Sequence, residues 1–188
     1  MSSDLTDRPA GDIWIFGYGS LMWQPNFPFA EKQHARLHGY HRALCIYSFE
    51  YRGTRDCPGL VFGLDRGGSC HGIAFRVLEQ NAEAVIAYLH EREMITGVYR
   101  PRWQSIRLQS SGQPPVRVNA YIFVADRSHE QYAGTLPDEE TVKLVRQGRG
   151  KSGPCIDYLK NTLDHLYELS IQDYTLARIV TKTLATEG

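Results

Sequence analysis

The sequence predicts an α+β fold, with a small mixed or antiparallel β-barrel and surrounding helices. Three observations support this prediction. Short β-rich runs separated by turn residues fill much of the first two thirds of the chain, one helical period interrupts them at residues 79–94, and the last third is helical. Closing such short strands into a barrel would cover the edges that an open sheet exposes.

Size and composition favour a single domain. The chain has 188 residues, of which 42% are hydrophobic, and this is enough to bury a sizeable core within the length of one domain. The polar residues 1–11 are expected to form a flexible tail, and residues 12–188 a single domain. No repeat, low-complexity block or linker composition marks a further boundary.

Charge and cysteine content narrow the class of function. Basic and acidic side chains number 21 each, so no net field would attract nucleic acid or an anionic membrane, and a small molecule is the expected partner. No apolar run approaches the roughly 20 residues that span a bilayer, and no export signal is evident. The four cysteines are therefore expected to be reduced thiols in the cytoplasm. No feature of the sequence indicates an oligomeric state.

The first elements are strands. Residues 13–16 predict a strand that leads directly into Gly17-Tyr18-Gly19-Ser20, where two glycines permit a sharp turn. Residues 35–49 have the content of one long bent strand or two short ones. Residues 59–64 and 71–77 predict a hairpin, because the Asp-Arg-Gly-Gly segment between them is typical of a turn.

The helical elements follow from spacing. Apolar residues recur with helical period between residues 79 and 94, without a proline, so a helix is expected there. Two more strands are expected over residues 102–108 and 116–125. Helices are then predicted for three segments of the last third of the chain, residues 138–147, 155–170 and 173–184.

Glu93 is the candidate catalytic residue that helix geometry selects. At 100° per residue, Ile86 and Ala82 lie about 20° from Glu93 around the helix, whereas Glu91 lies about 160° away. Glu93 is thus expected to point inwards, where a carboxylate is costly unless it is paired or neutralised. Without catalysis, the position would be explained by a frayed helix end facing water or by an ion pair with an arginine such as Arg42, Arg52 or Arg76.

The loop Gly17-Tyr18-Gly19-Ser20-Leu21 is the second candidate site. Its successive backbone NH groups can line a concavity that binds a carboxylate or a developing oxyanion. A turn that merely reverses the chain would have the same composition. No metal and no cofactor is expected, because His90, Glu91 and Glu93 lack a second histidine at the spacing that a metal site needs.

Several separated motifs resemble one known family in the same order. Residues 16–23, Phe-Gly-Tyr-Gly-Ser-Leu-Met-Trp, resemble the opening signature of the ChaC family of glutathione-specific γ-glutamylcyclotransferases. The later blocks that resemble the family lie at residues 52–54, 58–61, 72–76, 88–93, 152–154 and 157–159. The resemblance covers residues 12 to about 170.

The resemblance implies a fold of the γ-glutamylcyclotransferase-like type, a small β-barrel with surrounding helices. It implies that the glutamate ending the Tyr-Leu-x-x-Arg-Glu block, Glu93, is catalytic, which is the residue that helix geometry also selects. The substrate-binding candidates are the loop residues and two further side chains: Tyr18, Gly19, Ser20, Leu21, Arg52 and Tyr121. A core position for Tyr121 and a surface ion pair for Arg52 are the alternatives.

The activity that the resemblance implies is cleavage of glutathione to 5-oxoproline and Cys-Gly. The γ-glutamyl α-amine would attack its own γ-carbonyl, with Glu93 as general base and then general acid. Other γ-glutamyl amines or amino acids as substrates, or a non-catalytic γ-glutamyl-binding domain, are the alternatives. The chain departs from some relatives at Ala84, where they carry a second acidic residue, although Glu83 is adjacent.

Overall fold

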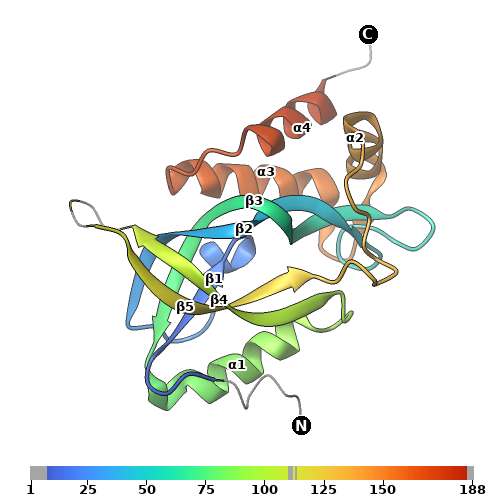
Figure 1. Ribbon diagram of the computed structural model, residues 1–188. Helices are drawn as coiled ribbons and strands as arrows, with labels where there is room; N and C mark the ends of the chain where they lie inside the picture. Colours follow the sequence, from blue (N-terminus) through green and yellow to red (C-terminus); the bar gives the residue numbers. More distant parts are fainter. Residues whose placement is uncertain (1–7, 110–111, 113, 186–188) are drawn as a thin grey trace. The chain divides into compact units, whose positions relative to one another are not determined.

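The structure is a computed structural model that describes residues 8–109, 112 and 114–185 (Figure 1). Its contacts divide the chain into two compact units. Unit 1 contains the residues up to Arg42 together with Leu64–Asp126, and unit 2 contains Ala43–Gly63 together with the residues from Arg127 onward. The single domain over residues 12–188 stays a prediction. Residues 1–7 of the expected tail lie outside the described residues.

Five strands form a closed barrel in the order β1-β3-β2-β4-β5. The strands are β1 (Ile13–Gly17), β2 (Glu31–Ser48), β3 (Gly59–Val77), β4 (Tyr99–Gln109) and β5 (Val116–Ala125). Strand β1 pairs antiparallel with β3 and parallel with β5, so the barrel is mixed. The predicted α+β barrel is confirmed (Figure 1).

Strand β3 corrects the predicted hairpin. Residues 59–77 form one continuous strand of 19 residues. Gly67 and Gly68 have φ values of +98° and +66°, a conformation that glycine adopts at little cost. They change the direction of the backbone locally without reversing the strand. Of the two alternatives for residues 35–49, the single long strand is the one observed, as part of β2.

Helix α1 (Glu79–Glu93) completes unit 1 and lies alongside the barrel strands in Figure 1. Its buried residues are Ala82, Val85, Ile86 and Leu89, which is the apolar stripe that the helical spacing predicts. The short 3₁₀ helix η2 (Ser20–Met22) follows β1. Residue Gly11 donates its amide hydrogen to Oε1 of Glu79 at 3.2 Å, which ties the start of β1 to the start of α1.

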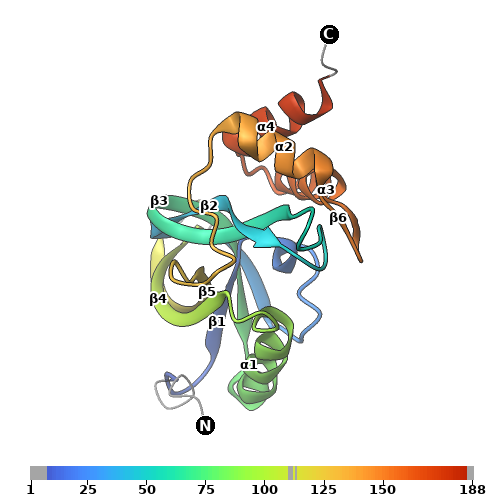
Figure 2. The ribbon, with the colours of Figure 1, turned by 90° about the vertical axis from the view of Figure 1, so that its right-hand side faces the viewer.

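Unit 2 contains the three C-terminal helices α2 (Asp138–Gln147), α3 (Cys155–Glu168) and α4 (Tyr174–Leu184), with the two-residue strands β6 (Arg149–Gly150) and β7 (Gly153–Pro154) between α2 and α3. The helices pack on one another (Figure 2). At the start of α2, the carboxylate of Asp138 pairs with Nε of Arg178 at 2.9 Å and Nζ of Lys182 at 2.8 Å, both on α4. These contacts lower the pKa of Asp138.

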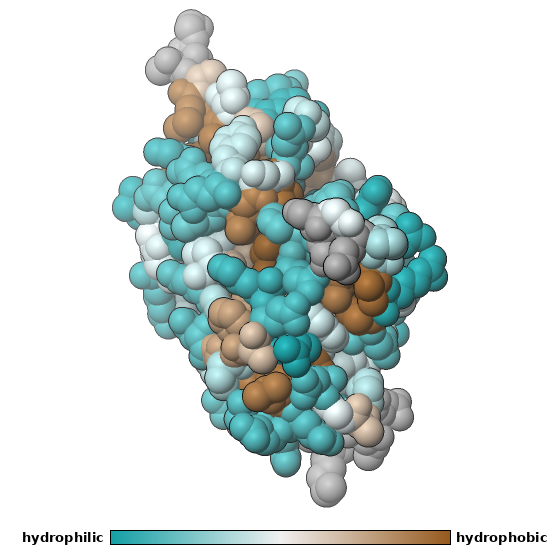
Figure 3. Space-filling model, turned by 90° about the vertical axis from the view of Figure 1, so that its left-hand side faces the viewer, coloured by the Kyte–Doolittle hydropathy of each residue, from teal (hydrophilic) through white to brown (hydrophobic). Residues whose placement is uncertain are grey.

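Hydrophilic residues predominate on the face shown in Figure 3, and hydrophobic residues appear there as separate groups. Among the described helices, none is long and apolar enough to cross a membrane. The four cysteines are free: Cys57 is exposed, and the buried ones are Cys45, Cys70 and Cys155.

Candidate active site

Glu93 is the last residue of α1, and its side chain is 21% exposed. Burial raises the pKa of Glu93 above the ordinary range of glutamate, and Arg92 offsets part of this shift. The partial negative charge at the C-terminus of a helix also disfavours a carboxylate, so it acts in the same direction as burial. Glu93 is therefore a mostly buried carboxyl group that holds its proton more tightly than glutamate in water.

Arg92 connects Glu93 to the glycine loop. Its Nε atom lies 3.2 Å from Oε1 of Glu93, and its Nη2 donates to Oγ of Ser20 at 2.9 Å. Its Nη1 donates to the carbonyl of Gln24 at 2.7 Å and to the hydroxyl of Tyr88 at 3.1 Å. Ser20 and Glu93 thus share one guanidinium. The ion pair considered from the sequence exists, but its cation is the neighbouring arginine instead of Arg42, Arg52 or Arg76.

The glycine loop presents backbone amides. The carbonyl of Gly19 accepts from the amide of Met22 at 2.9 Å, and the carbonyl of Tyr18 accepts from Nε of Arg42 at 2.6 Å. The amides of Gly19, Ser20 and Leu21 donate no hydrogen bond to any part of the chain that the structure describes. The carbonyls of residues 18–20 therefore accept hydrogen bonds within the chain, while three consecutive NH groups are available to an anion.

Close packing holds this loop in place. A Cβ atom at Gly17 would lie 3.0 Å from Cβ of Leu21, and one at Gly72 would lie 2.2 Å from the carbonyl oxygen of Gly17. The side chains of Tyr18 and Leu21 are buried. Leu21 and Tyr18 therefore anchor the loop, and larger residues at the two glycines would displace it.

Tyr121 lies in a group of aromatic side chains on β5, β4 and α1. Its hydroxyl is 2.7 Å from Nε2 of His90, and its ring centroid is 4.9 Å from that of Trp103. Tyr121 is fully buried and pairs with Ile15 of β1, the strand that leads into the glycine loop. The Nε1 atom of Trp103 is also buried and finds no hydrogen-bond partner among the described residues. Buried donors are normally hydrogen-bonded, so this NH group is available to an acceptor from outside the described chain.

Arg52 belongs to unit 2. Its Nη1 donates to the carbonyls of Ser152 at 2.5 Å and Pro154 at 3.3 Å, and its guanidinium lies 5.3 Å from the centroid of the Tyr158 ring. Three of the sequence blocks that resemble the family, at residues 52–54, 152–154 and 157–159, thus meet within unit 2. The structure brings Glu93 together with the loop in unit 1, and the substrate-binding role of Arg52 stays a prediction.

Sequence reasoning missed Arg92 and Trp103 as site residues, and it considered His90 only as a metal ligand. Arg92 stands in the same Tyr-Leu-x-x-Arg-Glu block as Glu93, so that block already contained the signal. Trp103 is found through the register of β4 and β5, which places it directly opposite Tyr121. In the described part of the chain, no group of three His, Cys, Asp or Glu side chains is arranged to hold a metal ion.

The model of the ChaC-like protein family matches residues 13–185. The glutathione-specific gamma-glutamylcyclotransferase of Escherichia coli (strain K12) is 36% identical over 174 residues, which cover 92% of this chain and 74% of the relative. The glutathione-specific gamma-glutamylcyclotransferase 1 of Homo sapiens is 32% identical over 172 residues, with coverages of 89% and 77%.

The crystal structure of a selenomethionine-labelled gamma-glutamyl cyclotransferase specific to glutathione from yeast superposes with a TM-score of 0.82. It covers 92% of this chain and 96% of its own, at 19% identity, and so supports the fold alone. The family match spans both units and includes the glycine loop, α1 and the Arg52 region. The chain belongs to the ChaC-like family.

Proposed function

We propose that this protein is a γ-glutamylcyclotransferase that cleaves glutathione to 5-oxoproline and Cys-Gly. The names of its relatives support this activity. One observation from the structure carries the assignment of the site: a mostly buried glutamate and a loop with three available amides share the guanidinium of Arg92.

The reaction is intramolecular, so both reacting groups are already tethered. The α-ammonium of the γ-glutamyl group gives a proton to the Glu93 carboxylate, and the resulting amine attacks the γ-carbonyl carbon. A carbon–nitrogen bond closes the five-membered ring, and the carbonyl oxygen becomes an oxyanion. The intermediate then collapses: the bond to the cysteinyl nitrogen breaks, and Glu93 returns its proton to that departing nitrogen. The positively charged ring nitrogen gives up its second proton, and Cys-Gly leaves with one more proton as an ammonium, so that the lactam is neutral.

The environment of Glu93 suits both proton transfers. A glutamate in water has a pKa of about 4.3, which is too acidic to hold a proton long enough at neutral pH. Burial raises the pKa of Glu93 towards the range in which one carboxyl group can act as base and then as acid. The contact with Arg92 limits this rise, so that the carboxylate form needed for the first step stays accessible.

The remaining candidates would hold the substrate. The amides at residues 19–21 would bind the substrate α-carboxylate or stabilise the oxyanion, with Tyr18 and Leu21 fixing the loop from beneath. Tyr121 would line the pocket beside Trp103, whose unpaired NH group is a donor for a substrate oxygen. Arg52 is retained as a substrate-binding residue on the basis of the family resemblance alone.

The decisive experiment measures 5-oxoproline released from glutathione by wild type, Glu93→Gln and Glu91→Gln, with and without a chelator. Glu93→Gln should lose at least about 10²-fold in kcat, the usual contribution of acid–base catalysis. Glu91→Gln, an exposed neighbour on the same helix, should retain activity. Full turnover by Glu93→Gln would rule out the mechanism.

The same assay tests the rival substrates. Release of 5-oxoproline from other γ-glutamyl amines or amino acids, with little from glutathione, would move the activity to those compounds. Binding of glutathione without any 5-oxoproline would identify a non-catalytic γ-glutamyl-binding domain instead. We also propose a cytoplasmic location and a small-molecule partner without nucleic acid or membrane, because the free thiols fit the reducing cytosol and the charges balance.

A further inference from the structure

Three arginines lie directly opposite one another on neighbouring strands of the barrel. Arg36 of β2 pairs with Arg107 of β4, and Arg107 pairs with Arg117 of β5. We refer to Arg36, Arg107 and Arg117 as the arginine row. Residues directly opposite on paired strands have Cβ atoms only about 4.5–5.5 Å apart. The three side chains therefore start from neighbouring positions on three adjacent strands.

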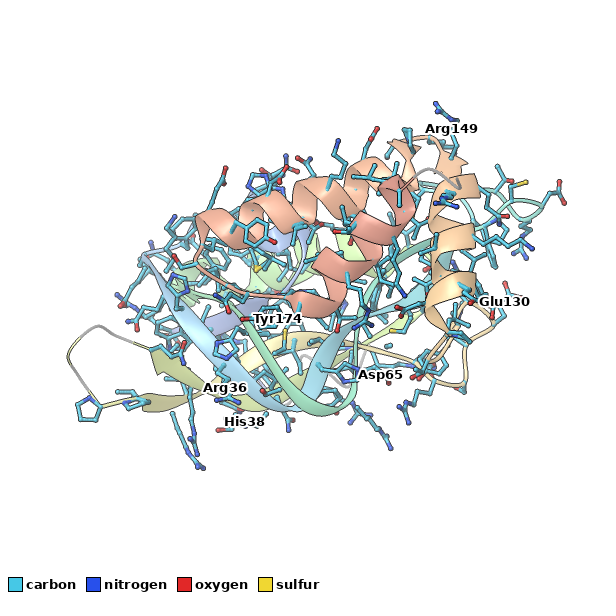
Figure 4. All side chains as sticks on the ribbon, turned by 90° about the horizontal axis from the view of Figure 1, so that it is seen from above. Arg36, His38, Asp65, Glu130, Arg149 and Tyr174 are labelled. Carbon is cyan, nitrogen blue, oxygen red and sulfur yellow. The ribbon has the colours of Figure 1, made fainter. Side chains whose placement is uncertain are left out.

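The arginine row faces outwards. On β2 and β4, the residues that flank its arginines are buried, whereas Arg107 and Arg117 are exposed and Arg36 is partly exposed. The buried flanking residues are Ala35, Leu37, Ile106 and Leu108. Because successive side chains of a strand point to opposite faces, the row lies on the outer surface of the barrel. Figure 4 labels Arg36 together with His38, the next residue on the same face of β2.

No acidic side chain compensates this charge within the described part of the chain. Arg36 donates from Nε and Nη2 to Oγ of Ser69 at 3.2 and 3.0 Å, and no ion pair forms at any member of the row. Two other arginines of unit 1 are paired with carboxylates: Arg76 with Asp12, and Arg100 with Asp126. Like charges directly opposite one another destabilise a sheet, so the arginine row carries a repulsion that no ion pair offsets in the described part of the chain.

The field of the row reaches the histidines beside it. Burial lowers the pKa of His38, and Arg36, Arg107 and Arg117 each lower it further. Burial and then Arg36 likewise lower the pKa of His71, on β3. All three arginines thus lie within electrostatic reach of one neighbouring ring.

We infer that the arginine row is a binding site for a compact anion that carries two or more phosphoryl groups. Guanidinium groups bind phosphate oxygens through paired N–H donors, and a row of them supplies several such forks side by side. Three adjacent strands span about 10 Å at the usual strand spacing, the scale of a short phosphoryl chain. The protein as a whole carries no net charge, which disfavours an extended polyanion and favours a ligand confined to the row.

Arg107 is the sharpest probe because it lies between the other two arginines. Without an anion it is repelled from both sides, so Arg107→Gln should raise the melting temperature or leave it unchanged. With an anion bound, the same residue should contribute most to affinity. A residue that lowers stability but raises affinity for the anion belongs to a binding site. A purely structural residue would not combine these two effects.

The test titrates the full-length protein calorimetrically with inorganic tripolyphosphate at about 50 and 200 mM salt. Saturable binding with a stoichiometry of one is expected, and it should weaken at the higher salt concentration. Arg107→Gln should weaken tripolyphosphate binding about 10-fold or more, and Arg117→Gln should also weaken it. Arg100→Gln is the matched control: it removes one exposed positive charge from the same strand, but that charge is already paired with Asp126.

The outcomes separate the site from diffuse attraction. Equal loss of affinity in Arg107→Gln and Arg100→Gln would show general charge attraction and overturn the proposal, as would absence of saturable binding. Binding that depends on the arginine row but occurs only with an RNA oligonucleotide, or only with vesicles of anionic lipid, would overturn the proposal that the ligand is a compact anion. Release of 5-oxoproline from glutathione should be unchanged in Arg107→Gln, so this proposal and the proposed enzymatic activity fail independently.

Discussion

The Nε atom of Arg92 lies 3.2 Å from Oε1 of Glu93, and the same guanidinium donates to the hydroxyl of Ser20. One side chain therefore contacts both the candidate acid–base group and the glycine loop. Burial raises the pKa of Glu93, and Arg92 lowers it again in part. Arg92 therefore has two roles, one geometric and one electrostatic. A different substitution tests each role.

Replacing Arg92 should affect geometry and pKa in different ways. Arg92→Lys keeps the charge but cannot reach Ser20, Gln24 and Glu93 together, so kcat/KM should fall by about 10²-fold with little change in its pH profile. Arg92→Gln also removes the charge that lowers the pKa of Glu93, so the acidic limb of the profile should move to higher pH. The measurement is kcat/KM for 5-oxoproline formation across pH, with Arg100→Gln as control. Identical profiles for Arg92→Gln and wild type would contradict the electrostatic role.

Glu93→Gln should change the pH dependence of stability. Because the folded state raises the pKa of Glu93, it binds a proton more tightly than the unfolded chain does. Wild type should therefore lose stability relative to Glu93→Gln as pH rises above about 4.3, and the difference should level off above the folded pKa. Urea unfolding at several pH values between 4 and 8 measures this difference. Glu91→Gln should show no such trend, and a constant difference for Glu93→Gln would mean that burial does not shift its titration.

Trp103→Phe tests the unpaired indole NH beside Tyr121. The substitution keeps an aromatic ring in contact with Tyr121 but removes a buried donor that has no partner among the described residues. Thermal stability should change little, because no hydrogen bond within the protein is lost. If the NH group binds a substrate oxygen, KM for glutathione should rise about 3- to 10-fold, the effect of one neutral hydrogen bond. An unchanged KM would remove Trp103 from the pocket.

The cysteines should differ sharply in reactivity. Burial raises the pKa of Cys155 to about 11, and its thiol donates to the carbonyl of Leu60 at 3.1 Å. The thiolate is the reactive form, so Cys155 should resist iodoacetamide at neutral pH in the folded protein. Cys57 is exposed and should be alkylated first. Mass spectrometry of the modified peptides checks this order, and rapid labelling of Cys155 without unfolding would contradict it.

Local patterns predicted most of the fold. The apolar stripe of α1, the extent of α2 and the barrel all follow from periodicity and turn residues, which act over a few positions. The hairpin predicted at residues 65–68 was wrong, because two adjacent glycines in a strand have the same composition as a turn. Only the pairing of β3 with its neighbours, which is long-range, decides between them.

The candidate site was predictable in part for the same reason. Helical spacing is local, so it places Glu93 beside the buried face of α1. The contact of Arg92 with Ser20 joins residues 72 positions apart in the sequence, and no local pattern contains it. The arginine row depends on the register of three strands, and therefore needs the structure as well.

The parallel pairing of β1 with β5 has a consequence for synthesis of the chain. Ile15 emerges early from the ribosome, but its partner Tyr121 follows only after β2, β3, α1 and β4 have been made. Until then one edge of β1 is unpaired, and such edges invite association between nascent chains. The glycine loop that follows β1 acquires its final support only when the barrel closes, so incomplete chains should aggregate and lack catalytic competence.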